Sequence, residues 1–362
     1  NILKPTIMKK ITLFVFFLLG INALYSQTLV INEIMSTNTS VITDDDDEYQ
    51  DWIEIYYNGA IAFNLEGYGI SDDVTLPYKW VFPEYWIEPG DHLVLWCSDK
   101  NRTDINNDLH TNFKIGSGGE IITLTKPDGS VADAYPAVVI GNNISYGRQT
   151  DGAATLVYFA QPTPWESNTT QGYSQVIATP TISVASGFFT SSFPVALSHP
   201  DPTVTIVYTL DGSDPEITNV SGTNYNYKNS YVEIPGQTNG PMLQNSYRSF
   251  SYTAPITIND RTSQPNDLAK MSSTYHNVPS YIPSFNIFKG TVIKARAFKA
   301  GAIPSQIVSK TYVVSPLGAS RFSLPVVSLS LPENKYFDYN DGTFVSGKDF
   351  DDWRTANPTV IA

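Results

Sequence analysis

The sequence contains one cysteine, Cys97, and only four histidines among its 362 residues. With Cys97 as its only cysteine, the chain has no internal disulfide, no zinc site built on cysteines and no lipoprotein anchor on a cysteine. The histidines are scattered, with no pair at metal-ligand spacing: His92, His110, His199 and His276. We therefore expect surface or hydrogen-bonded histidines and no histidine-based metal centre.

Basic residues are also scarce, since 22 Lys and Arg face 35 Asp and Glu and give a net charge of -13. A surface of this sign repels phosphate backbones and anionic lipid, so nucleic acid is not an expected partner. The length suits two or three domains, and the 41% hydrophobic content is enough to give them cores.

Long apolar runs are absent after the N-terminus. Lys9 and Lys10 precede the apolar residues 11–19, the order of a secretory signal. A membrane anchor is the alternative, but the run ends at Gly20 and falls short of roughly 20 residues. We predict upstream residues 1–7, a signal peptide over 8–26 and a mature protein that begins at Gln27. The product is then secreted or held at the cell surface, with no further membrane span.

Catalytic motifs are missing as well. The sequence has no phosphate-binding loop, and the glycines around Ser117 lack the spacing of a nucleophile elbow. Glycoside hydrolysis needs two carboxylates across a cleft, whereas Asp211 and Asp214 lie in one turn. We expect no enzyme activity and no catalytic residue in this chain.

Short strands separated by turns fill residues 27–168. Candidate strands lie at 29–31, 52–56, 79–82, 92–96 and 120–124. Turn signals such as Pro89-Gly90 separate them, and no helical period appears, so the pattern predicts a β-sandwich.

Four motifs give this segment a family resemblance: VINEI at 30–34, DWIEIY at 51–56, LEGYGISD at 65–72 and KPDG at 126–129. They resemble the lamin-tail domain of secreted bacterial proteins, which implies an immunoglobulin-like sandwich. The segment departs from the family at its end, where Pro164-Trp165 replaces the usual Pro-Gly.

An acidic run inside this segment is a candidate calcium site. The candidate ligands are Asp44, Asp46, Glu48 and Asp51. Carboxylate oxygens are the ligands that Ca²⁺ prefers. A solvated turn is the alternative, because neighbouring carboxylates repel one another and no glycine or distal glutamate of a known calcium loop is present. Calcium is the only cofactor that the sequence suggests.

A linker at 169–179, rich in polar residues and proline, precedes a second predicted β-domain at 180–314. Its motifs are VYTLDGSDP at 207–215, YTAPI at 252–256 and GTVIKARAF at 290–298. They resemble the C-terminal domain of chitobiases and β-hexosaminidases, which implies a small, non-catalytic β-sandwich. The fold class is thus all-β, with two consecutive sandwiches.

Two insertions, at 217–251 and 259–288, interrupt this second resemblance. Their tyrosines suggest a glycan-binding surface: Tyr227, Tyr231, Tyr247 and Tyr281. Aromatic rings stack on sugars, but they equally serve to pin loops to a domain. Both interpretations stay open.

Residues 315–362 carry LPVVSLS at 324–330 and FDYNDGTFVSG at 337–347. These motifs resemble the opening of the spore-coat CotH family, which implies the incomplete start of a kinase-like domain. The family's nucleotide and metal ligands lie further on. We expect an accessory region that positions or targets a downstream kinase-like domain of the same protein. The alternative is a module that binds cell-surface polysaccharide.

Overall fold

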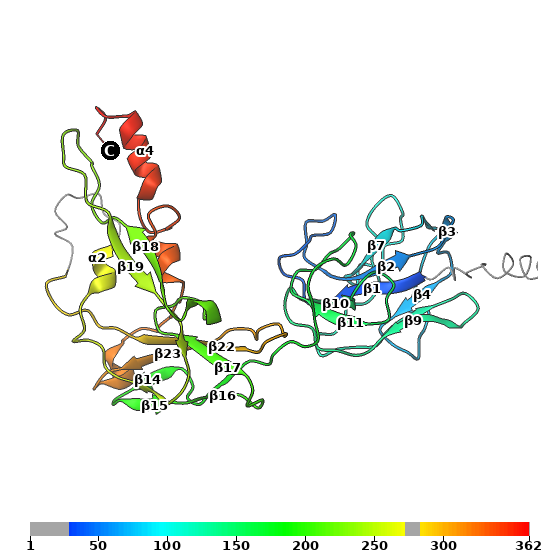
Figure 1. Cartoon of the computed structure of the whole chain (residues 1–362), viewed down its shortest axis with the longest axis horizontal. Helices are drawn as coiled ribbons and strands as arrows, with labels where there is room; N and C mark the ends of the chain where they lie inside the picture. Colours follow the sequence, from blue (N-terminus) through cyan, green and yellow to red (C-terminus); the bar gives the residue numbers. More distant parts are fainter. Residues whose placement is uncertain (1–28, 272–282, 362) are drawn as a thin grey trace, which may run out of the picture. The chain divides into compact units, whose positions relative to one another are not determined.

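The computed structural model describes residues 29–271 and 283–361. They divide into two compact units, with the division between Gln175 and Val176. Strands dominate both units (Figure 1), as the all-β prediction requires. No helix in the described ranges is long and apolar enough to cross a membrane. The predicted signal peptide lies outside the described residues.

The first unit contains two antiparallel sheets. The larger has the order β12-β11-β10-β1-β2-β7, formed by β1 (Leu29–Met35), β2 (Asp51–Tyr57), β7 (His92–Cys97), β10 (Ser145–Arg148), β11 (Leu156–Phe159) and β12 (Gly172–Tyr173). The smaller has the order β5-β4-β8-β9, formed by β4 (Gly69–Ser71), β5 (Trp80–Val81), β8 (Ile122–Thr125) and β9 (Val131–Tyr135). A short ladder joins β3 (Phe63–Asn64) to β6 (Trp86–Ile87). The predicted β-sandwich is confirmed.

The larger sheet is buried on both faces. Ile53 pairs with Leu95, and both side chains are fully buried on one face. Trp52 and Trp96 lie on the other face of the sheet. The partly buried Val41 and Ile42, from the loop between β1 and β2, pack against these tryptophans. The second face of this sheet is therefore covered at the tryptophans by a loop.

The end of the first unit is fixed by polar contacts to β2. The backbone N–H of Trp165 donates to Glu54 Oε2 at 2.7 Å. Trp165 has a φ of 65°, in the left-handed region that glycine adopts with less strain. The chain then pairs β12 with β11, and β12 lies inside the predicted linker 169–179.

The second unit has a five-stranded sheet of order β14-β23-β22-β17-β20. Its strands are β14 (Gly187–Phe189), β17 (Thr205–Thr209), β20 (Phe250–Ser251), β22 (Thr291–Phe298) and β23 (Val308–Val314). Two short ladders face its core, β13 (Thr181–Ile182) with β16 (Leu197–Ser198), and β15 (Phe193–Val195) with β21 (Ile256–Ile258). The core includes Ile293 and Ala295 of β22.

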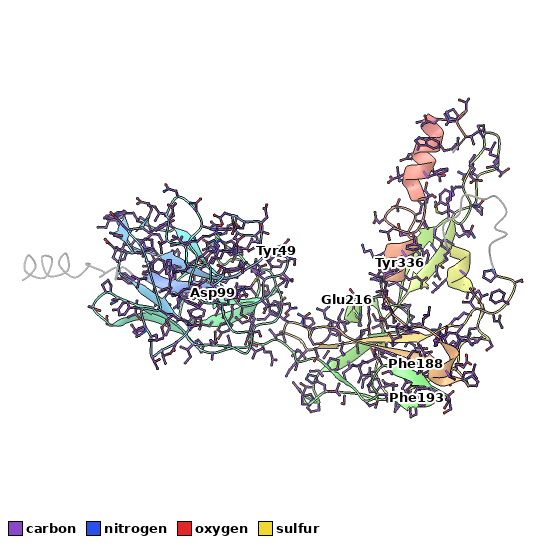
Figure 2. The ribbon with its side chains drawn as sticks, turned by 180° about the vertical axis from the view of Figure 1, so that it is seen from behind. Tyr49, Asp99, Phe188, Phe193, Glu216 and Tyr336 are labelled. Atoms are coloured by element: carbon purple, nitrogen blue, oxygen red, sulfur yellow. The ribbon has the colours of Figure 1, made fainter. Side chains whose placement is uncertain are left out.

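The remaining elements of this unit come from the insertions and the C-terminal segment, which we define as residues 315–361. They are η1 (Ile217–Asn219), β18 (Thr223–Tyr227), β19 (Leu243–Tyr247), α2 (Asp267–Met271), η2 (Gly318–Arg321), α3 (Glu333–Phe337) and α4 (Gly347–Ala356). Strands β18 and β19 pair as an antiparallel hairpin, and we call residues 223–247 the insertion hairpin. Figure 2 shows Phe193 in the sandwich and Tyr336 in the part built by the C-terminal segment.

Candidate functional site

The acidic run forms an ordered turn, residues 44–48, which we call the acid turn. Asp44 is buried, and its Oδ1 accepts the backbone N–H groups of Asp46 at 3.1 Å and Glu48 at 2.9 Å. The Lys100 Nζ lies 2.5 Å from Asp44 Oδ2, 2.5 Å from Asp46 Oδ2 and 2.9 Å from Glu48 Oε2. The ammonium group thus lies among the carboxylates that the sequence assigned to calcium.

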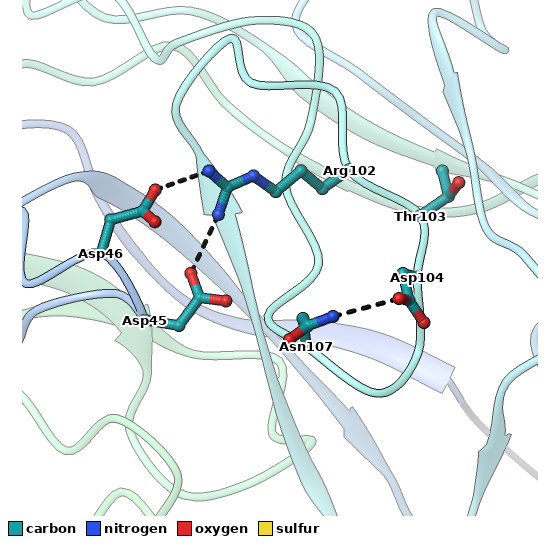
Figure 3. Close-up of a pocket in the computed structure, with 6 residues that line it drawn as sticks. All are labelled: Asp45, Asp46, Arg102, Thr103, Asp104 and Asn107. Carbon is teal, nitrogen blue, oxygen red and sulfur yellow. Dashed lines mark hydrogen bonds and ion pairs between the residues drawn. The ribbon is translucent and has the colours of Figure 1, made fainter.

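Arg102 adds a second cation at the rim of the acid turn (Figure 3). Its guanidinium lies 3.1 Å from Asp45 Oδ1 and 2.6 Å from Asp46 Oδ2. Hydrogen bonds from Lys100 and Arg102 lower the pKa of Asp46 to about 2. Ion pairs with Lys100 and Arg102 therefore hold the acid turn, whereas the alternative interpretation was a turn whose carboxylates are solvated.

Asp51, the fourth predicted calcium ligand, does not join this cluster. It begins β2 opposite Cys97, and its Oδ2 accepts the backbone N–H of Ile115 at 3.2 Å. Burial raises its pKa to about 7. Asp44, Asp46 and Glu48 offer ligand atoms within 4.8 Å of one another, and Asp51 is not part of that group. The calcium site stays a prediction.

His110 is the site residue that sequence reasoning missed. Its side chain is fully buried, and its Nδ1 shares a 2.8 Å hydrogen bond with Ser98 Oγ. Its Nε2 has no hydrogen-bond partner and lies 3.5 Å from Asp45 Oδ1. Burial, together with Lys100 and Arg102, lowers the pKa of the imidazole, so His110 is neutral at neutral pH. A backbone pairing of His110 with Arg102, visible only in the fold, brings the ring to the acid turn.

A second acidic cluster lies inside the first unit. Glu33 pairs with Glu54 across β1 and β2, and both are fully buried. Burial raises the pKa of Glu54 to about 8, and the neighbouring Glu33 adds to the rise. Asn32 Nδ2 donates to Glu54 Oε1 at 3.0 Å. Solvent does not reach these carboxyls, so the cluster is part of the structural core.

The predicted glycan-binding tyrosines separate into three groups. Tyr231 is fully buried, and its hydroxyl accepts the backbone N–H of Gly347 at 2.9 Å. No face of its ring is free for a sugar. Tyr231 therefore fits the alternative interpretation, in which the ring pins a loop to the domain. Tyr227 and Tyr247 are half-buried, each 6.4 Å from the ring of Tyr225. Tyr281 lies outside the described residues.

Buried polar contacts join the insertion hairpin to the C-terminal segment. Lys228 is 2% exposed, and its Nζ lies 2.5 Å from Asp351 Oδ2 in α4. Arg354, also in α4, donates to the Val232 carbonyl at 2.9 Å and to the Glu233 carbonyl at 2.7 Å. Figure 1 shows α4 beyond the hairpin strands, at the end of the unit away from β14 and β15.

The α3 helix makes a further contact with the same hairpin. The Tyr225 hydroxyl donates to Glu333 Oε1 at 2.5 Å, and the Asn226 carbonyl accepts the backbone N–H of Tyr339 at 2.7 Å. Each contact joins residues more than one hundred positions apart. The insertion hairpin is therefore a platform for the C-terminal segment.

Two domain families match the chain. Residues 23–138 match the model of the Lamin Tail Domain, and residues 195–312 match the model described as Fn3 associated. The first unit is similar to the lamin tail domain. No curated protein and no solved structure matches the chain.

These matches support the lamin-tail resemblance and the immunoglobulin-like fold of the first unit. Both matched domains are non-catalytic modules of an accessory or binding kind. For the second unit the matched family is Fn3 associated, so its resemblance to chitobiases stays a prediction. Neither match extends beyond residue 312, and the CotH resemblance of the C-terminal segment also stays a prediction.

Proposed function

We propose that this chain is a non-catalytic accessory region of an exported protein, and that it positions a further, kinase-like domain of that protein. The observation that carries the proposal is the docking of the C-terminal segment on the insertion hairpin through Lys228 and Asp351. The CotH resemblance supplies the class of the downstream domain, and the predicted signal peptide supplies export.

The burial of Lys228 indicates that the C-terminal segment packs specifically on the insertion hairpin. A buried ammonium group is costly unless an opposite charge and hydrogen bonds compensate it. Lys228 Nζ donates to Asp351 Oδ2 at 2.5 Å and to Asn239 Oδ1 at 2.6 Å, and it lies 4.8 Å from the ring centroid of Tyr231. Without α4, the carboxylate of Asp351 is missing from this set of partners. The hairpin and the C-terminal segment are therefore matched to one another.

Exposed apolar side chains between the sandwich and α3 are consistent with a further domain that covers them. Leu324 is 77% exposed, Val327 81% and Leu329 82%, within a stretch that pairs with no strand in the described part of the chain. Contiguous exposed apolar residues are typical of surfaces that further protein covers. We assign this cover to the domain that follows the C-terminal segment.

The glycan-binding alternative has no comparable observation in its favour. Of the tyrosines proposed to stack on sugars, Tyr231 is buried against α4, and Tyr227 and Tyr247 lie half-buried around Tyr225. Sugar-binding platforms need an open ring face.

Limited proteolysis with thermolysin tests the dock. Lys228→Met removes the ammonium group and leaves Asp351 without its cation, so α4 detaches more often. We expect cleavage within residues 332–357 to accelerate at least about tenfold, which corresponds to a loss of about 1.4 kcal/mol. Lys299→Met is the matched control, because Lys299 pairs with Asp201 at 2.8 Å on the surface of the same unit. Equal cleavage rates in both variants and the wild type would refute the proposed dock.

A further inference from the structure

His110 points its one unsatisfied nitrogen at the acid turn. The side chain is fully buried, and Nε2 has no hydrogen-bond partner although Asp45 Oδ1 lies 3.5 Å away. A buried polar atom without a partner costs free energy, and native proteins rarely keep one without a reason. A ligand between Nε2 and the carboxylate would remove this cost.

The separation of the two atoms fits a metal ion better than a hydrogen bond. A histidine N–H donates to a carboxylate oxygen at a nitrogen–oxygen distance of about 2.9 Å. Two ligands of a tetrahedral zinc ion, each at roughly 2.1 Å, lie about 3.4 Å apart. The observed 3.5 Å between His110 Nε2 and Asp45 Oδ1 is close to that ligand separation.

A third ligand is already in place. Ligand atoms of Asp44, Asp45 and His110 all lie within 4.8 Å of one another. We propose that His110, Asp45 and Asp44 form a binding site for a divalent transition metal of the zinc class. This site is independent of the proposed function of the second unit.

The surroundings of His110 prepare it as a ligand. Metal-binding histidines donate their other ring N–H to a hydrogen-bond partner that fixes the tautomer. Ser98 Oγ is such a partner, at 2.8 Å from Nδ1. With the proton on Nδ1, the lone pair of Nε2 faces Asp45.

Charge and access also favour a cation. The acid turn carries five carboxylates, Asp44 to Glu48, and meets the two cations Lys100 and Arg102, so negative charge is in excess. When a metal takes Asp44, Lys100 keeps Asp46 at 2.5 Å and Glu48 at 2.9 Å. A pocket lined in part by Asp45, Arg102 and Asp104 opens to solvent at the rim of the acid turn (Figure 3).

The nitrogen ligand decides the class of metal. Calcium takes six to eight oxygen ligands, whereas the set of Asp44, Asp45 and His110 offers a nitrogen and only two carboxylates. Imidazole combined with carboxylate suits zinc and its neighbours in the first transition row. Residues 44–48 alone offer only oxygen ligands and therefore suggest calcium. The nitrogen ligand His110 comes from a distant part of the sequence and joins them only in the fold.

Calorimetric titration of the whole chain with ZnCl₂ tests the site. We expect one zinc ion per chain, with at least about tenfold weaker binding in His110→Gln and in Asp45→Asn. Asp45 is partly exposed and replaceable without disturbing the core, which keeps the test valid if the histidine variant folds poorly. His199→Ala is the matched control and should bind zinc as the wild type does, because His199 lies in the second unit.

The outcomes separate the alternatives. Loss of zinc binding in both site variants with retention in the control supports the site. Zinc binding that is absent from the wild type, or unchanged in both site variants, overturns it. Calcium binding of equal strength that His110→Gln leaves unchanged also overturns it, because the site would then use oxygen ligands alone.

Discussion

At the scale of single residues, the turn after β17 shows how backbone geometry explains an acidic motif. Asp211 Oδ1 accepts the Ser213 N–H at 3.0 Å, and Gly212 adopts a φ of 82°. A Cβ on Gly212 would lie 2.5 Å from the Leu331 carbonyl oxygen. Asp211 thus stabilises the turn that follows β17, and its place directly after a strand is typical of such a turn residue.

Asp211→Ala tests this assignment. The substitution removes the acceptor for the Ser213 N–H and for the Arg248 N–H, the latter at 3.1 Å. We expect a loss of roughly 1 kcal/mol in the free energy of unfolding, as for other side chains that cap backbone groups. Chemical denaturation measures it. A variant as stable as the wild type would show that the carboxylate has another purpose.

Asp51 should make the first unit sensitive to pH. Burial raises its pKa from 3.8 to about 7, so the folded protein keeps a proton that the unfolded chain releases. The contribution of this group is therefore greatest in acid. It falls by about 1.4 kcal/mol per pH unit as the pH rises through that window, and it is lost above the folded pKa.

Asp51→Asn removes this titration and retains an oxygen to accept the Ile115 N–H. Denaturation of both proteins from about pH 5 to about pH 8 should show a flatter profile for the variant. The variant should be the more stable protein at the alkaline end. Parallel profiles would contradict the raised pKa.

Local motifs were predictable at this scale, and distant partners were not. The acid turn is evident in the sequence, but Lys100 and His110 meet it only after β2 and β7 pair. Hydrophobic alternation indicates which face of a strand is buried, but it carries no information about which loop follows an adjacent strand in space.

At the scale of elements, the insertion hairpin is the feature that the sequence indicated least. The composition of residues 217–251 suggests a surface loop, whereas β18 and β19 form a ladder and pack against α3 and α4. The tyrosines drew attention to this segment. Their role emerged only with the C-terminal segment in place, because burial of Tyr231 depends on residues far along the chain.

Tyr231→Phe probes this packing. It removes the acceptor for the Gly347 N–H at the start of α4 and leaves a buried donor unsatisfied. We expect α4 to open more readily, by about 1–3 kcal/mol, in amide hydrogen exchange. Tyr227→Phe on the same hairpin is the control, since Tyr227 is only half-buried. Equal effects of both substitutions would contradict the assigned role of the Tyr231 hydroxyl.

At the scale of the whole molecule, the chain has two units with separate cores. The first sandwich followed from short strands and turn residues, because these are local signals, whereas the second was implied by a family resemblance. The position of the division was less predictable, since β12 lies inside the polar stretch that resembles a linker. We expect residues 27–175 to fold alone with the melting midpoint they have in the whole chain. A midpoint lower by several degrees would show that the units depend on one another.

Hydrogen exchange of the whole chain tests the central claim most directly, namely that the insertion hairpin and the C-terminal segment form one cooperative structure. We predict that the amides of β18, β19 and α4 share one opening free energy and that Lys228→Met lowers it for all three elements together. The contrary result is rapid exchange of α4 in the wild type while β18 and β19 stay protected. In that case the C-terminal segment is not held, and the proposed positioning function fails.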